Sequence, residues 1–121
     1  MIVRMKEKIQ KPKTDKSKYQ NLTPQKKYLV IEICREYLRV INDSEEPILY
    51  PKYLFDIVDY RLPSGWSFEE FDDGEYFMGP VELNKKGFYE NFFDHVPEAK
   101  TQFKKIFNSM LQDPVFKGSS R

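Results

Sequence analysis

The chain has 121 residues, of which 40% are hydrophobic and 32% charged, and its formal net charge is +1. This length and composition predict one globular domain with a single core. They exclude a membrane span, because the longest apolar run, residues 28–31, is far shorter than the roughly 20 residues that a bilayer requires. The single cysteine excludes an internal disulfide, and Lys6 and Lys8 interrupt any secretory signal, so we expect a cytoplasmic protein.

The near-neutral total charge hides a strong polarity along the chain. Residues 1–27 hold nine of the 20 basic groups and two of the 19 acidic ones, which gives +7 there and −6 in the remainder. Large apolar side chains are sparse in this segment and cannot offset the entropy of ordering it. We therefore predict a basic, loose arm over residues 1–22, a globular domain over 23–116 and a polar tail over 117–121.

The cations of this segment recur at every second or third residue, a spacing that suits contacts with a phosphate backbone. Lysine predominates, which favours point-charge contacts over the reading of base edges and hence binding without sequence preference. A solubilising tail is the alternative interpretation. The predicted nucleic-acid-binding residues are Arg4, Lys6, Lys8, Lys11, Lys13, Lys16, Lys18, Lys26 and Lys27.

The pattern after the arm predicts helices. Thr23 and Pro24 match a helix start, and residues 28–42 are apolar around most of a helical circumference, so we expect them to form the central helix. After the polar break at 42–47, Pro51 can open a second helix that ends at 63–65.

The stretch from Trp66 to Leu83 admits two interpretations. Residues 67–70 have the spacing of a capping box, which would begin a short helix. Asp73-Gly74 between two apolar arms indicates a hairpin instead, and we favour it. Beyond it, the spacing predicts one helix over 84–96 and another that begins at Pro97 and stops near residue 113.

These elements predict a mainly α fold, with α+β as the minority alternative. The expected architecture is a small domain of about four helices with a short β-hairpin near residues 66–78. A winged helix is a second alternative, although it lacks a recognition helix before Trp66.

The densest acidic cluster follows Trp66, and no Lys or Arg falls between Arg61 and Lys85 to neutralise it. Its order lacks the alternating oxygen ligands of a calcium loop. We interpret it as a surface that docks on a basic partner or on the protein's own arm, with an ordinary solvated loop as the alternative. The predicted partner-binding residues are Glu69, Glu70, Asp72, Asp73 and Glu75.

No motif predicts catalysis, a metal site or a cofactor. His95 follows Asp94, but nothing nearby in sequence supplies a nucleophile or a second acid aimed at it, and we expect it to lie at the surface or to cap a helix. One cysteine and one histidine do not supply a zinc site, and Cys34 is expected to be a small buried hydrophobe.

We therefore expect a non-enzymatic binding protein of a macromolecular assembly, whose lysine arm contacts nucleic acid while its helical body docks on a protein. The alternative is a small inhibitor or antitoxin-like module, encoded by a phage or mobile element, that uses the acidic loop to occupy a basic site on its target. The sequence leaves the oligomeric state open.

Overall fold

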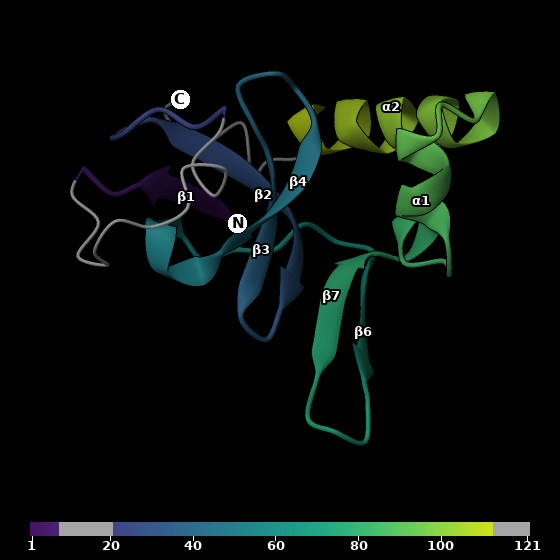
Figure 1. Cartoon of the computed structure of the whole chain (residues 1–121), viewed down its shortest axis with the longest axis horizontal. Coiled ribbons are helices and arrows are strands. Elements are labelled where there is room, and N and C mark those ends of the chain that lie inside the picture. Colours follow the sequence, from purple (N-terminus) through teal and green to yellow (C-terminus); the bar gives the residue numbers. More distant parts are fainter. Residues whose placement is uncertain (8–20, 113–121) are drawn as a thin grey trace.

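The structure, a computed structural model, describes residues 1–7 and 21–112 (Figure 1). Within these residues the chain forms seven strands, two α-helices and two 3-10 turns. The strands are β1 (Ile2–Met5), β2 (Lys27–Cys34), β3 (Tyr37–Ile41), β4 (Pro47–Pro51), β5 (Phe55–Asp59), β6 (Trp66–Glu70) and β7 (Tyr76–Pro80). The helices are α1 (Phe88–Phe93) and α2 (Pro97–Gln112), and the 3-10 turns are η2 (Lys52–Leu54) and η3 (Val81–Leu83).

The strands form one antiparallel sheet in the order β4-β3-β2-β1-β5. Two strands, β1 and β7, pair with different parts of the long strand β2. Its first half pairs with β1, where Leu29 lies opposite Ile2, and its last residues pair with β7, where Cys34 lies opposite Phe77. Strand β6 then pairs with β7, so the hairpin extends the sheet away from the central strands (Figure 1).

The prediction of a mainly α fold with about four helices is therefore wrong. The segment expected to be the central helix, residues 28–42, forms strands β2 and β3 instead. A strand buried on both faces is apolar at consecutive positions, and such a run looks apolar all around when it is placed on a helix. The β-branched residues Val30, Ile31 and Ile33 favour the extended conformation.

The turn between β2 and β3 explains why no break was visible in the sequence. It consists of Arg35 and Glu36 and contains neither glycine nor proline.

The predicted helix start at Thr23-Pro24 and the predicted helix from Pro51 are also wrong. The first is a turn, and the second is the short η2 followed by β5. The winged-helix alternative does not hold, because both described α-helices follow the strands.

Two predictions of local structure are confirmed. The hairpin near residues 66–78 is present as β6 and β7, and the final helix spans Pro97–Gln112. The helix expected over 84–96 is shorter, because the α-helix spans only Phe88–Phe93. Gly87 precedes it as the N-cap residue and has a φ of 80°. No α-helix in the described ranges has the length and apolarity that a membrane crossing requires.

The two faces of the sheet build two apolar clusters. One face carries Val3, Val30, Val40 and Leu54, all with no solvent exposure, together with Tyr50 and Phe55. The other face is covered by the helices, which Figure 1 shows on one side of the sheet. There the strand residues pack with the helix residues in a cluster that includes Ile2, Leu29, Ile31, Phe88, Phe92 and Phe103.

An irregularity in β2 places a charged pair between the sheet and α1. The register between β2 and β3 shifts between Val30 and Glu32, so Glu32 lies opposite Arg39. Arg39 Nε donates to Glu32 Oε1 at 2.8 Å, and the Arg39 guanidinium lies 3.6 Å from the centre of the Tyr89 ring. Both charged side chains are nearly buried, and burial raises the pKa of the Tyr89 phenol. This pair joins two strands to the first turn of α1.

The first residues of the chain lie inside the fold. Strand β1 sits between β2 and β5, with Val3 opposite Tyr28 on one side and opposite Ile57 on the other. Met1, Ile2, Val3 and Met5 are buried. The structure thus places Ile2–Met5, part of the predicted arm, in the sheet. The neighbouring strands β2 and β5 help to bury the apolar side chains of β1. Residues 8–20 and the predicted tail 117–121 lie outside the described residues.

Candidate functional site

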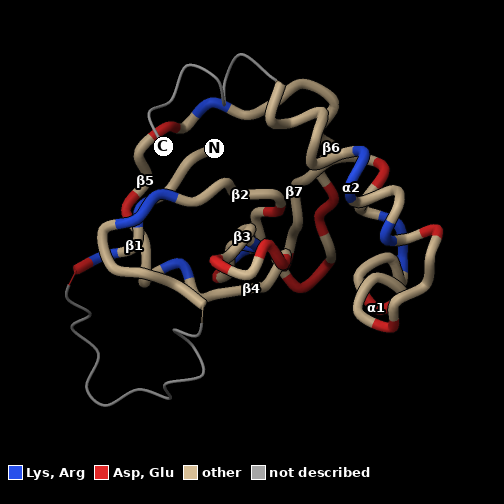
Figure 2. The backbone as a smooth tube through the Cα atoms, turned by 90° about the horizontal axis from the view of Figure 1, so that it is seen from above, with Lys and Arg blue, Asp and Glu red and all other residues tan. Residues whose placement is uncertain are grey.

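The hairpin β6–β7 carries all five acidic residues that the sequence singled out. Glu69 and Glu70 end β6, Asp72 and Asp73 lie in the turn, and Glu75 precedes β7. All five are exposed. Figure 1 shows the hairpin projecting from the rest of the sheet, and Figure 2 shows red residues along it. The fold therefore presents the predicted acidic cluster on one protruding element.

The turn at the tip is held by local hydrogen bonds. The amide of Phe71 donates to the carbonyl of Glu75 at 2.8 Å, and the amide of Gly74 donates to the carbonyl of Phe71 at 3.0 Å. The Asp73 carboxylate accepts from the amide of Glu75 at 3.0 Å. Gly74 has a φ of 86°, in the left-handed region that glycine adopts at low cost. The aspartate-glycine signal in the sequence is thus explained by its geometry.

Aromatic side chains accompany the carboxylates on both faces of the hairpin. Phe68 packs on Tyr76 with a centroid separation of 5.8 Å, and Phe71 packs on Phe77 at 5.6 Å. Phe68 and Phe71 nevertheless remain 56% and 47% exposed. Exposed aromatic rings supply much of the binding energy at protein interfaces, whereas exposed carboxylates supply orientation and association rate. The hairpin combines the two.

Cations of the body lie beside the hairpin without pairing with its carboxylates. Lys52 Nζ is 3.3 Å from the hydroxyl of Tyr76 and 5.6 Å from the centre of that ring. An Arg35 nitrogen lies 3.6 Å from the place that a Cβ on Gly74 would occupy. In the ranges that the structure describes, none of the five carboxylates forms an ion pair. These carboxylates therefore concentrate negative charge on the exposed surface of the hairpin.

The predicted nucleic-acid-binding cations are scattered among different environments. Arg4 lies within β1, opposite Asp56 of β5, and Lys6 is half-buried after that strand. Lys26 is exposed and Lys27 half-buried at the start of β2. The remaining predicted residues, Lys8, Lys11, Lys13, Lys16 and Lys18, lie outside the described residues.

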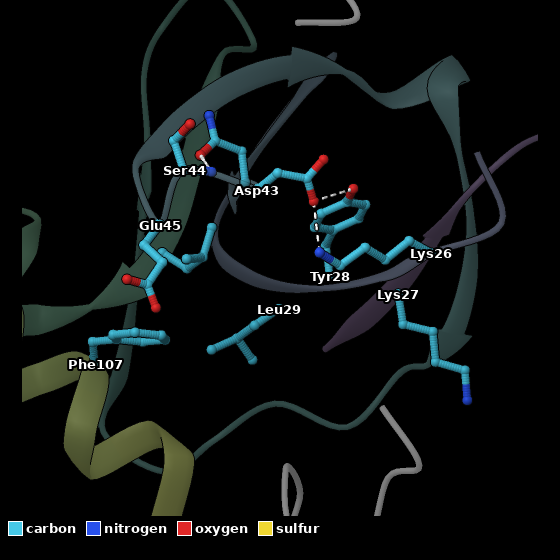
Figure 3. Close-up of a pocket in the computed structure, with 10 residues that line it drawn as sticks. Lys26, Lys27, Tyr28, Leu29, Asp43, Ser44, Glu45 and Phe107 are labelled. Carbon is cyan, nitrogen blue, oxygen red and sulfur yellow. Dashed lines mark hydrogen bonds and ion pairs between the residues drawn. The ribbon is translucent and has the colours of Figure 1, made fainter. Parts of the chain in front are cut away.

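Lys26 is tied to a polar network at the mouth of a groove of about 460 Å³, which Figure 3 shows in close-up. Asp43 accepts hydrogen bonds from Lys26 Nζ at 2.7 Å and from the Tyr28 hydroxyl at 2.9 Å on the same oxygen. Thr23 adds a bond from its hydroxyl to the other Asp43 oxygen at 2.9 Å and one from its amide to the Tyr28 oxygen at 2.6 Å. Leu29 and Phe107 form the apolar wall. The network joins the start of β2 to the loop before β4.

The shifted pKa values of Tyr28 and Asp43 favour a structural role for this network. Burial, aided by Asp43, raises the pKa of Tyr28 from 10.0 to about 12. Burial also acts to raise the pKa of Asp43, but the bonds from Lys26, Tyr28 and Thr23 outweigh it and lower that pKa. A phenol that stays protonated and a carboxylate that stays ionised form a stable hydrogen bond at neutral pH, and neither is poised to transfer a proton there.

The single histidine and the single cysteine lie in different parts of the fold, His95 just after α1 and Cys34 at the end of β2. His95 is exposed just after α1, with a φ of 62°, and its amide donates to the carbonyl of Phe92 at 3.1 Å, as expected for a residue at a helix end. Cys34 is half-buried in β2, and burial, with Glu32 adding to it, raises its pKa to about 11. In residues 1–7 and 21–112, no three side chains of the metal-binding types converge.

Comparison with models of protein families, with curated proteins and with solved structures finds no match to this chain.

One feature of the hairpin was not predicted from the sequence: within the described residues, β6 pairs with β7 alone and is an edge of the sheet. Strand order depends on contacts between distant segments, here the pairing of β7 with Ile33 and Cys34 of β2. The apolar residues on either side of Asp73-Gly74 indicated a hairpin, but nothing in the sequence marked an edge.

Proposed function

We propose that this protein is a non-enzymatic docking module that uses the hairpin β6–β7 to bind a basic surface of another protein. The observation that carries the proposal is the gathering of five exposed, unpaired carboxylates and two exposed phenylalanines on one projecting element. Such a surface attracts a cationic partner at a distance and offers apolar area on contact. A small inhibitor or antitoxin-like module that occupies a basic site would use it in this way.

The geometry elsewhere supports binding more than turnover. The polar groups at the mouth of the groove beside Lys26 are hydrogen-bonded to one another, and the tyrosine and carboxylate among them are held in protonation states that do not exchange protons near neutral pH. A catalytic site needs a group whose proton or lone pair is free to react. The hairpin, in contrast, carries exposed carboxylates that form no ion pair with the described residues.

The test is capture of partners by the full chain from the native source, after nuclease treatment, with a hairpin variant and a matched control. The hairpin variant carries Glu69→Gln, Glu70→Gln, Asp72→Asn and Asp73→Asn. The control carries Glu7→Gln, Glu46→Gln, Asp56→Asn and Glu90→Gln, all at exposed positions outside the hairpin. Both sets remove the same amount of negative charge.

We expect the hairpin variant to lose the captured protein and the control to retain it. Equal capture by both variants would contradict the proposal, because charge on the hairpin would then have no special role. Capture that disappears with nuclease for the wild-type chain would favour a nucleic-acid tether through the basic segment, which was the other expectation from the sequence.

A further inference from the structure

The outer edge of β6 presents backbone groups that no other described strand uses. In an antiparallel pair, residues on one strand alternate between facing the partner strand and facing away from it with their N–H and C=O groups. The amide of Phe71 donates a hydrogen bond to the carbonyl of Glu75, so the backbone N–H of Phe71 is directed toward the chain that leads into β7. Because the direction of the backbone groups alternates along the strand, those of Glu69 and Ser67 are also directed toward β7. The backbone groups of Glu70 and Phe68 are directed toward the open edge.

The side chains on this edge determine what can pair with it. Glu69 and Glu70 alternate in direction along β6, so each face of the strand carries a carboxylate. A second copy of β6 placed alongside would bring like charges together, and charges of one sign at an edge discourage such pairing. A strand rich in lysine or arginine would instead meet opposite charge on both faces and would pack its side-chain stems on Phe68.

The two other sheet edges differ in chemistry. Strand β5 exposes Ile57 and Val58, and strand β4 exposes Leu49. Neither has a pair of adjacent carboxylates within the strand. Charge complementarity therefore selects β6 as the edge for a basic segment.

We propose that β6 is a strand-addition site: an extended, lysine- or arginine-rich segment of a partner protein pairs with the free backbone groups of Phe68 and Glu70. This inference rests on the proposed docking function and specifies its form, because strand addition obtains affinity from main-chain hydrogen bonds and specificity from side chains. The partner segment is expected to be unpaired and extended before it binds.

The test uses the full chain and a short peptide of repeating Lys-Lys-Thr-Thr, which places lysine on both faces of an extended strand. A second peptide has the same sequence with N-methyl groups along its backbone, so that it keeps its charge and cannot donate main-chain hydrogen bonds. We expect the first peptide to bind more tightly than the second by roughly tenfold or more. Amide exchange at Phe68 and Glu70 should slow when the first peptide binds.

Two variants separate the backbone of Glu70 from its charge. Glu70→Pro and Glu70→Gln remove the same carboxylate, but only proline removes the outward N–H, at an edge position where a strand tolerates it. We expect Glu70→Pro to bind the first peptide roughly tenfold more weakly than Glu70→Gln does. The peptide comparison does not depend on the folding of either variant.

The outcomes distinguish this inference from the proposed function. Equal affinity for the two peptides, with equal effects of the two variants, would overturn strand addition and leave docking through side chains in place. Absence of binding to either peptide would also overturn strand addition, and the capture experiment would then decide the docking function independently. Pairing of two copies through β6, detected as a dimer that Glu70→Pro abolishes, would overturn the assignment of a basic occupant.

Discussion

Tyr28 and Asp43 form the polar contact that joins the start of β2 to the loop before β4. Burial raises the pKa of Tyr28 to about 12, so the folded state prefers the protonated phenol. This preference stabilises the fold fully below the pKa of an unfolded tyrosine, about 10, and is lost as the pH rises toward 12.

Replacement of Tyr28 by phenylalanine should therefore reduce the dependence of stability on alkaline pH. Between pH 9 and pH 12 the free energy of unfolding of the wild-type chain should fall by about 2 kcal/mol more than that of Tyr28→Phe. Urea denaturation across this range measures the difference. Tyr50 and Tyr89 also have raised pKa values and leave a residual dependence in the variant. Parallel curves for the two proteins would contradict the assignment.

Arg39 and Glu32 form an ion pair between β2 and β3 that is almost completely buried. Loss of one partner from such a pair leaves an uncompensated buried charge, so Arg39→Met should destabilise the protein by about 3 to 5 kcal/mol. The double variant Glu32→Gln with Arg39→Met removes both charges and should recover much of that loss. Chemical denaturation of the single and double variants checks this, and additive losses would argue against a coupled pair.

At the scale of elements, the hairpin packs closely against β2. Gly79 is buried, and a Cβ there would lie 3.0 Å from the carbonyl oxygen of Ile31 and 3.1 Å from Asn84 Oδ1. The nearer of these atoms belongs to the backbone, which has little freedom to move. The absence of a side chain at Gly79 thus allows β7 to approach β2.

Gly79→Ala should force the two strands apart and cost about 1 to 3 kcal/mol of stability, the range for overpacking of a tight site. Gly65→Ala is the comparison variant, because open space surrounds its Cβ position even though its φ of 84° is unfavourable for alanine. Thermal unfolding of the two variants measures the contrast. A Gly79→Ala protein as stable as the wild type would show that β7 does not pack on β2 as described.

Local signals predicted the elements whose structure is determined locally. The spacing of Ala99, Phe103 and Met110, which are buried in α2, gave the last helix, and Asp73-Gly74 gave the hairpin. Strands β2 and β3 were not predicted, because a run buried on both sides has the same composition as a central helix. The turn at Arg35-Glu36 gave no signal that could have decided between them.

The candidate site was predicted only in part, because some of its features depend on contacts between distant segments. The exposure of the acidic cluster followed from its composition and is confirmed, whereas its docking function stays a prediction. The open edge of β6 depends on strand order and could not be read from residues 66–78. The role of the lysines also stays a prediction, although Lys26 is bonded to Asp43 and Arg4 lies in a strand.

For the whole molecule, the position of β1 is decisive, because β1 pairs with β2 on one side and with the edge strand β5 on the other. Val3 has no solvent exposure and contacts the core beside Val30 and Leu54. A carboxylate at this position would be buried without a partner. Val3→Asp should therefore lower the free energy of unfolding by more than about 4 kcal/mol and prevent stable folding.

Circular dichroism of Val3→Asp, with Glu7→Lys as the exposed control, tests this placement. A loose N-terminal arm would tolerate both changes equally. Retention of the native spectrum and melting temperature by Val3→Asp would contradict the placement of β1 between β2 and β5.

We propose the hairpin β6–β7 as the surface on which a basic partner docks. The most direct test of this proposal is zero-length cross-linking of carboxylates to amines in nuclease-treated material from the native source, followed by mapping of the linked residues. We expect lysines of the partner to become joined to Glu69, Glu70, Asp72, Asp73 or Glu75. Cross-links to a partner that map to exposed acidic residues of the helices, such as Glu90 and Glu98, and leave the hairpin unlinked would contradict it.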